Sequence, residues 1–242
     1  MTWSIIARDR DGRFGVAIAS RFFAVGALCV HTQRGVGALS TQALMNPLYG
    51  PAGLARLAQG RLAAEVVATL TAADAGRALR QLHVMGAHGV AAAHTGAACI
   101  DWCGHRVGAD FSVAGNMLAG PQVLQATAAA YQASAGRTLA ERLIAALAAG
   151  EAAGGDKRGK QSAALRIQGD EDRAELDLRV DDHAEPMAEL RRLLEVSRQR
   201  FQPFVACLAG RHDPVGELDR SRIEARIEAA QALHAAGQAS PH

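Results

Sequence analysis

Two apolar runs joined by a short charged segment commit the start of this chain to a β-hairpin. The runs are Trp3 to Ala7 and Phe14 to Ala19, and each has the length and composition of a buried strand. The segment between them contains Asp11-Gly12, a pair that suits a hairpin turn with positive φ. Apolar residues at 24–30 and 35–39 predict a second hairpin in the same sheet. Four strands are therefore expected before the first helix.

The rest of the chain alternates groups of helices with groups of strands. Helices are indicated where apolar residues recur every three or four positions behind a turn or a capping signal, such as Thr138 with Glu141. The expected helices lie around 54–60, 63–70, 121–131, 138–150, 186–201 and 223–233, and further strands around 80–85, 90–93, 111–114, 162–167 and 176–180, with an irregular segment at 95–110. This order lacks the strict strand–helix alternation of a doubly wound parallel sheet. It predicts an α+β fold in which antiparallel sheets are covered by helices.

Composition and charge narrow the class of protein. The 242 residues are 49% hydrophobic and 4% aromatic, which is typical of a helix-rich globular protein. With 26 basic and 24 acidic residues the net charge is +2, and no basic face predicts a nucleic-acid partner. There is no run of about 18 apolar residues that would span a membrane, and no secretory signal is recognised. Four irregularly spaced cysteines are expected to stay reduced, so the sequence indicates a cytoplasmic protein.

A series of short motifs runs over roughly the first 195 residues. They are Met1 to Asp9, Gly15 to Ser20, Thr41-Gln42, Asn46-Pro47, Tyr49-Gly50, His94 to Gly96, Gly104-His105, Gly115-Asn116, Gly154 to Ser162 and Arg179 to His183. In this order they resemble a bacterial family known as domain of unknown function 1028. The resemblance implies the fold of the N-terminal-nucleophile hydrolases, a four-layer αββα sandwich of two antiparallel sheets between helix layers. It assigns residues 1–200 to this domain and leaves 201–242 as a helical C-terminal tail.

Thr2 is the candidate nucleophile. A chain-terminal threonine supplies a hydroxyl that attacks a carbonyl and a free α-amine that serves as its base. An unperturbed α-amine has a pKa of ~8, close to neutral pH. Because threonine is small, methionine aminopeptidase is expected to remove Met1 and expose this amine. The expected reaction is hydrolysis of an amide or related carbon–nitrogen bond in a small molecule, with no metal or other cofactor.

Three more residues are expected around Thr2. Backbone N–H groups near Gln42 and the side-chain amide of Asn116 are candidate donors to the oxyanion of the tetrahedral intermediate. Ser20 ends the second strand, at the level where hydrolases of this superfamily commonly place an acidic residue facing the nucleophile. The candidate substrate-pocket residues are Asn46, His105, Asp156 and Ser162, and the candidate cations near the amine are Arg8, Arg34, Lys157 and Lys160.

Two other clusters of polar residues are expected to have structural roles. His94, Cys99, Cys103 and His105 include side chains that zinc accepts, but their spacing is not that of a usual zinc site, so no metal is expected. The segment 181–183 is expected to close a strand and to cap the helix that follows.

Other functions remain open beside the amide hydrolase. One alternative is a non-catalytic ligand-binding or accessory protein on the same fold, which the serine at position 20 favours. Another is an internal nucleophile, either Cys29 or Ser20. An exposed antiparallel sheet edge and a spare C-terminal helix predict a homo-oligomer.

Overall fold

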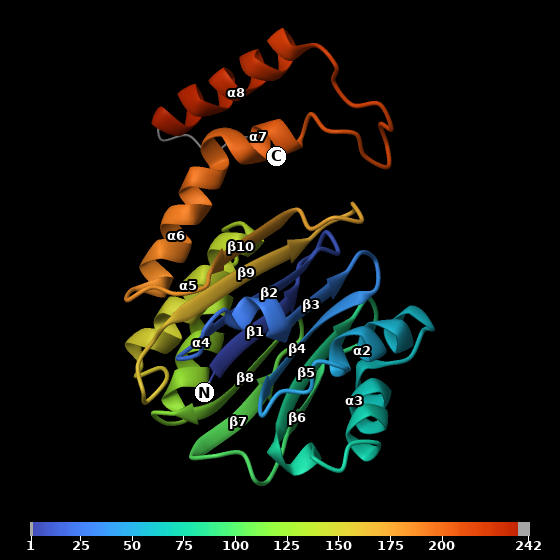
Figure 1. Cartoon of the computed structure of the whole chain (residues 1–242), viewed down its shortest axis with the longest axis vertical. Coiled ribbons are helices and arrows are strands. Elements are labelled where there is room, and N and C mark those ends of the chain that lie inside the picture. The colour runs from blue at the N-terminus through green and yellow to red at the C-terminus, as the bar shows by residue number, and fades with distance from the viewer. Residues whose placement is uncertain (1, 237–242) are drawn as a thin grey trace. The chain divides into compact units, whose positions relative to one another are not determined.

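In the computed structural model, which describes residues 2–236, the first hairpin lies at the centre of a large sheet (Figure 1). Strands β1 (Thr2–Arg8) and β2 (Phe14–Ser20) pair antiparallel, as the two apolar runs predict. The other edge of β1 pairs antiparallel with β8 (Phe111–Leu118). The sheet has six strands in the order β10-β9-β2-β1-β8-β7. Its outer strands are β7 (Trp102–Val107), β9 (Ser162–Gln168) and β10 (Leu176–Val180).

A second antiparallel sheet contains four strands. Its order is β3-β4-β5-β6, formed by β3 (Val30–Gln33), β4 (Gly37–Ala43), β5 (Arg80–Gly86) and β6 (Ala92–Thr95). The second predicted hairpin therefore belongs to this sheet and not to the first one. Its expected strand at 24–30 is also wrong, because the helix α1 (Val25–Cys29) occupies most of that range. A short apolar run does not by itself distinguish a strand from a buried turn of helix, and Ser162 Oγ accepts the Val25 N–H at the start of this helix.

Strand β7 lies inside the segment that the sequence indicates to be irregular. Its six residues are half-buried or exposed without alternation, since β7 is the edge strand of the large sheet. The period-2 signal that identifies a half-buried strand is therefore absent from its sequence. A register shift between Trp102 and Gly104 interrupts its pairing with β8 further.

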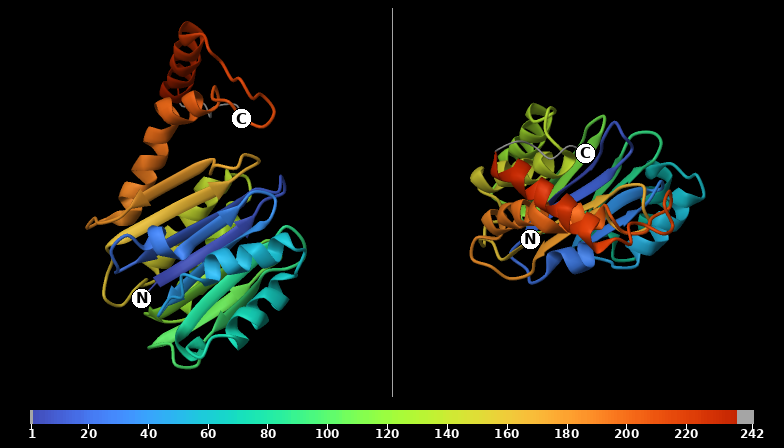
Figure 2. Two further views of the ribbon diagram at one scale, coloured as in Figure 1. Left: turned by 45° about the vertical axis from the view of Figure 1, so that its right-hand side comes forward. Right: turned by 90° about the horizontal axis from the view of Figure 1, so that it is seen from above.

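The two sheets stack face to face, and helices cover both outer faces (Figure 1 and Figure 2). Helices α4 (Gln122–Ala133) and α5 (Leu139–Ala152) pack on the six-stranded sheet, and α2 (Tyr49–Ala58) and α3 (Ala63–Ala72) pack on the four-stranded one. Side chains alternate along β1 accordingly: Trp3 lies against α5 beside Gly150, whereas Ile6 packs between the sheets with Ala38 and Met85. The predicted α+β, four-layer αββα sandwich is confirmed.

The residues predicted to cap helices do so in the structure. Thr138 Oγ1 accepts the Glu141 N–H at 3.4 Å, and Glu141 Oε2 accepts the Thr138 N–H at 3.1 Å, so the predicted capping box begins α5. His183 Nδ1 accepts the Glu185 N–H at 2.9 Å just before α6 (Pro186–Val196), as expected for the 181–183 segment. A turn of 3₁₀ helix, Arg77–Leu79, leads into β5.

The chain divides into two compact units, one up to Leu190 and one from Arg191 on. In the second unit, a turn of π-helix (Ser197–Phe201) leads into α7 (Gln202–Val205), and α8 (Arg220–Ala235) follows a loop. Arg200 joins these segments through two hydrogen bonds to Glu224 on α8. Within residues 2–236 no helix combines the length and the apolar character needed to cross a membrane.

Candidate active site at the Thr2 end of the sheets

Thr2 begins β1 with a candidate partner on each side. The sheet register places it opposite Ser20 on β2 and opposite Asn116 on β8, so the three side chains share one face of the sheet. Thr2 Oγ1 lies 3.1 Å from Ser20 Oγ. Thr2 is 5% exposed, and Ser20 and Asn116 are also buried. Three of the four residues predicted for catalysis therefore lie side by side.

Gln42, the fourth of these residues, reaches the site through Ser4. Ser4 lies two residues after Thr2 on the same face of β1, and its hydroxyl donates to Gln42 Oε1 at 2.7 Å. Gln42 is fully buried on β4, in the opposite sheet. Its side chain thus links the two sheets just behind the Thr2 hydroxyl.

Gln81 on β5 joins these groups into one network. Its Oε1 atom accepts hydrogen bonds from Gln42 Nε2 at 2.7 Å and from Asn116 Nδ2 at 3.1 Å. Its Nε2 atom lies 2.9 Å from both the Gly104 and Gly115 carbonyl oxygens. Gln81 is fully buried. The side chain therefore fixes the position of two of the predicted catalytic amides.

Two histidines extend the network in opposite directions. His83 on β5 is fully buried, with Nε2 2.9 Å from Ser4 Oγ and Nδ1 3.2 Å from Ser112 Oγ. Burial lowers the pKa of His83 to about 3, so its ring is neutral at physiological pH. His105 on β7 is exposed, and its Nδ1 lies 2.9 Å from the hydroxyl of Thr95, which also accepts from Gln81. His105 thus connects to the site through two intervening side chains.

The hub residues Ser4, Gln81 and His83 were missed by the sequence interpretation. Each is a buried polar residue on a strand and is followed directly by a buried apolar one. Such a polar residue within an apolar strand is a usable signal, because a buried polar side chain needs a hydrogen-bond partner. The partners themselves lie on other strands, so the sequence does not identify them.

Asp156 and Ser162, two of the predicted pocket residues, hold the segment that follows β2. Asp156 Oδ2 accepts the Arg21 N–H at 3.1 Å, and its Oδ1 accepts the Arg158 N–H at 2.8 Å. The Ser162 hydroxyl donates to the Phe22 carbonyl and accepts the Val25 N–H at 3.2 Å. Arg21, Phe22 and Val25 follow Ser20 in the chain, so the two side chains hold the backbone that leaves β2. A direct role in a substrate pocket stays a prediction.

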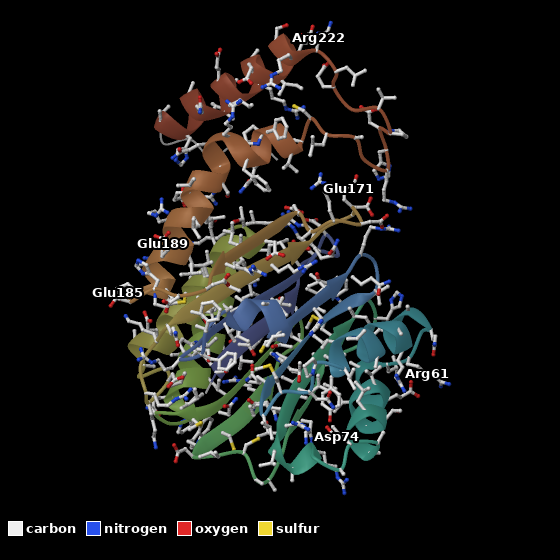
Figure 3. All side chains as sticks on the ribbon, in the orientation of Figure 1. Arg61, Asp74, Glu171, Glu185, Glu189 and Arg222 are labelled. Carbon is white, nitrogen blue, oxygen red and sulfur yellow. The ribbon has the colours of Figure 1, made fainter. Side chains whose placement is uncertain are left out.

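Asn46, another predicted pocket residue, anchors the segment after β4. Its Nδ2 atom donates to Asp74 Oδ2 at 3.1 Å, and the same carboxylate accepts from Tyr49 Oη at 2.8 Å and from Arg80 Nε at 3.1 Å. Asp74 lies just after α3 (Figure 3). Hydrogen bonds from Asn46, then Tyr49, hold the pKa of Asp74 well below its usual range. The ionised carboxylate thereby fixes the backbone that leaves the site beyond Gln42.

The four candidate cations lie in different places. Arg8 is at the far end of β1, where it donates to the Gly86 and Ala87 carbonyls, and Arg34 pairs with Asp170 and Asp172. Lys160 forms ion pairs with Glu151 and Glu185. The Lys157 backbone N–H donates to the carbonyl of Met117, the residue after Asn116, and its ammonium group pairs with Asp101.

The alternative nucleophile Cys29 and the candidate zinc ligands have other surroundings. Cys29 is fully buried against Met45, and burial raises the pKa of its thiol to about 12, so it stays protonated and unreactive. His94 Nε2 lies 2.9 Å from the Arg77 carbonyl oxygen, and His105 contacts Thr95. Within residues 2–236 no three histidine, cysteine or acidic side chains are arranged to hold a metal ion.

Backbone strain gathers at the Thr2 end of the sheets. Among the described residues, the non-glycine positions with positive φ are Ala24 (52°), Ala43 (68°), Asp101 (58°) and Met117 (54°). Ala43 directly follows Gln42, and Met117 directly follows Asn116. The Met117 N–H donates to the Ile100 carbonyl, which places the strained Asp101 nearby as well. Left-handed backbone costs a non-glycine residue about 1–2 kcal/mol, and such strain is typical of functional sites.

We expect Ala43→Gly to stabilise the protein by roughly 0.5–1 kcal/mol, because glycine adopts the left-handed region without a steric cost. The matched control is Ala38→Gly, in the same strand at a position without positive φ, which should destabilise. Thermal unfolding of both variants checks the difference in sign. A loss of stability in Ala43→Gly equal to that in Ala38→Gly would contradict the strain at this position.

We expect Gln81→Leu to lower the free energy of unfolding by at least about 2 kcal/mol, because it leaves two side-chain amides and two carbonyls buried without their partner. The same substitution at the exposed Gln125 on α4 should change stability by no more than about 0.5 kcal/mol. Urea unfolding of the two variants measures the difference. Equal midpoints would show that the network contributes little to stability.

Comparison with known proteins supports the family resemblance seen in the sequence motifs. The crystal structure of protein SPO2555 from Silicibacter pomeroyi, described as a member of the DUF1028 family, is 32% identical in sequence and superposes with a TM-score of 0.83. The match covers 90% of this chain and 96% of that one. No curated protein matches the chain. Residues 2–190 match the model of a family of unknown function, DUF1028, and the chain belongs to this family.

Proposed function

We propose that the protein is an amide hydrolase of the N-terminal-nucleophile kind, with Thr2 as its nucleophile once Met1 has been removed. The observation that carries the proposal is the position of Thr2: its hydroxyl lies 3.1 Å from Ser20 Oγ, on a strand end flanked by the Asn116 amide. A nucleophile, a hydroxyl that orients it and an amide donor thus occur within one row of the sheet. This arrangement suits acyl transfer.

In the proposed reaction, Thr2 Oγ attacks the carbonyl carbon of the substrate amide while the Thr2 α-amine takes the hydroxyl proton. The Asn116 Nδ2 atom has two protons, of which one is donated to Gln81, and the other is the candidate donor to the oxyanion. Collapse of the intermediate breaks the carbon–nitrogen bond, and the proton passes to the leaving nitrogen. Water then hydrolyses the ester on Thr2, which releases a carboxylic acid and restores the hydroxyl.

The surroundings of Thr2 favour a neutral amine. Its neighbours Ser20 and Asn116 carry no charge, and the nearby ring of His83 is neutral. Burial among neutral groups disfavours the charged ammonium form. The amine is then available as a base near neutral pH.

A second candidate function is ligand binding without catalysis on the same fold. It is favoured by Ser20, because a serine hydroxyl beside Thr2 orients the nucleophile but supplies no acidic group. In either case we take the ligand to be a small molecule and the protein to be a cytoplasmic homo-oligomer that uses no metal or cofactor.

We expect Thr2→Ala to abolish turnover, with a loss of at least about 1,000-fold, because both the attacking oxygen and its geometry are removed. Thr2→Ser should retain part of the activity, and Thr69→Ala, at an exposed position of α3, should retain all of it. The measurement is a screen of small-molecule amides, followed by intact mass analysis for an acyl group on Thr2. Native protein that keeps Met1, or turnover that survives in Thr2→Ala, would contradict the proposal.

A further inference from the structure

The short segment after β2 displays two phenylalanines next to the candidate nucleophile. Ser20, the last residue of β2, pairs with Thr2, and Phe22 and Phe23 follow it at once. Phe22 is 44% exposed and Phe23 is 62% exposed. The chain contains only 6 phenylalanines, and two of them are therefore presented to solvent in this one place. Large apolar side chains that are grouped and exposed indicate a binding site.

This segment is held in place by its neighbours. Besides the bonds from Asp156 to Arg21 and from Ser162 to Phe22, the Ala24 N–H donates to the Asp181 carbonyl at 2.9 Å. Ala24 is in the left-handed region, a conformation that persists only where the surroundings impose it. The two phenylalanines are thus presented by a fixed backbone, and a ligand would not have to order it.

Two other loops at the same end of the sheets also present apolar side chains. Leu44, which is 58% exposed, directly follows the strained Ala43 and lies two residues after Gln42. Ile100, which is 61% exposed, accepts the Met117 N–H through its carbonyl and so lies beside the end of β8. Each strand end that carries a predicted catalytic residue is therefore followed or contacted by a loop with an exposed apolar side chain.

We infer that Phe22 and Phe23, with Leu44 and Ile100, form an apolar subsite that binds the acyl group of the substrate, so that the protein acts on amides of medium-chain or aromatic carboxylic acids. This inference rests on the proposed function, because it takes Thr2 as the point at which the acyl group is attached. We call these four residues the acyl subsite.

The size of the exposed surface favours a small ligand over a second copy of the chain. A phenylalanine side chain buries roughly 150–250 Å² when fully covered, so the exposed parts of Phe22 and Phe23 amount to about 100 Å² each. A stable protein interface needs about 800 Å² on each partner. Because Leu44 and Ile100 are exposed to a similar fraction, the four side chains together expose on the order of 400 Å², about half of that area, which favours a small ligand such as a short acyl chain or an aromatic ring.

Binding of carboxylic acid products tests the subsite without any turnover. In protein carrying Thr2→Ala, we expect hexanoate to bind at least about tenfold more tightly than acetate, since each buried methylene contributes roughly fourfold. Adding Phe22→Ala and Phe23→Ala should remove this preference and leave the melting temperature unchanged. Val90→Ala, at an equally exposed residue (62%) in the β5–β6 turn, should preserve it. Calorimetric titration measures each affinity.

A second experiment distinguishes binding of the acyl group at the subsite from its transfer to Thr2. Wild-type protein is incubated with the p-nitroanilides of acetic and hexanoic acid, and the acyl-enzyme is followed by intact mass. A hexanoate preference that depends on Phe22 and Phe23, but without any acyl-threonine, would overturn the hydrolase and support the subsite. Acylation at equal rates by both anilides, a hexanoate preference unaffected by the two alanines, or no detectable binding of either acid would overturn the subsite.

Discussion

The orientation of one buried amide, that of Gln81, determines the polarity of the whole candidate site. The carbonyl oxygens of Gly104 and Gly115 only accept hydrogen bonds, so the Gln81 nitrogen must face them. Its oxygen is then directed at Gln42 and Asn116, which are obliged to present their nitrogens. Because Gln42, Gln81 and Asn116 are buried, the reversed amide would place donors against donors and leave carbonyls unpaired, at a cost of several kcal/mol.

The orientation of the Gln81 amide also determines the direction of the hydrogen bonds at Ser4 and His83. With its nitrogen committed to Gln81, Gln42 offers its oxygen to Ser4, whose single proton is therefore donated there. The Ser4 oxygen is then an acceptor for His83 Nε2, which must carry a proton, and His83 Nδ1 accepts from Ser112. This tautomer is neutral, in agreement with the strongly lowered pKa of the ring. The side chains of this network, from Gln81 to Ser4 and His83, are thus polar and uncharged.

What the sequence predicts well is local. The hairpin of β1 and β2, the capping box of α5 and the antiparallel sheets covered by helices follow from apolar periodicity, turn residues and capping residues that are neighbours along the chain, whereas the four-layer αββα order comes from the family resemblance. The strand register brings Thr2, Ser20 and Asn116 side by side. The partners of Gln81 come from β4, β6, β7 and β8, and such contacts between distant segments leave no periodic trace in the sequence. The helix α1 was missed for a similar reason, since Ser162, far along the chain, supports its first turn.

Because the side chains around Gln81 are uncharged, the proposed mechanism needs no cation beside the Thr2 amine. If a cation were needed beside the Thr2 amine, the site would have to supply one, and the candidates Arg8, Arg34, Lys157 and Lys160 all contact other groups. Burial beside neutral hydroxyls and amides disfavours the charged ammonium form by desolvation. It also strengthens the attraction between an oxyanion and the Asn116 amide, because a low local dielectric screens it less. Under the proposed mechanism, the uncharged hydrogen-bond network around Gln81 therefore holds the Asn116 amide in position to donate to the oxyanion when it forms.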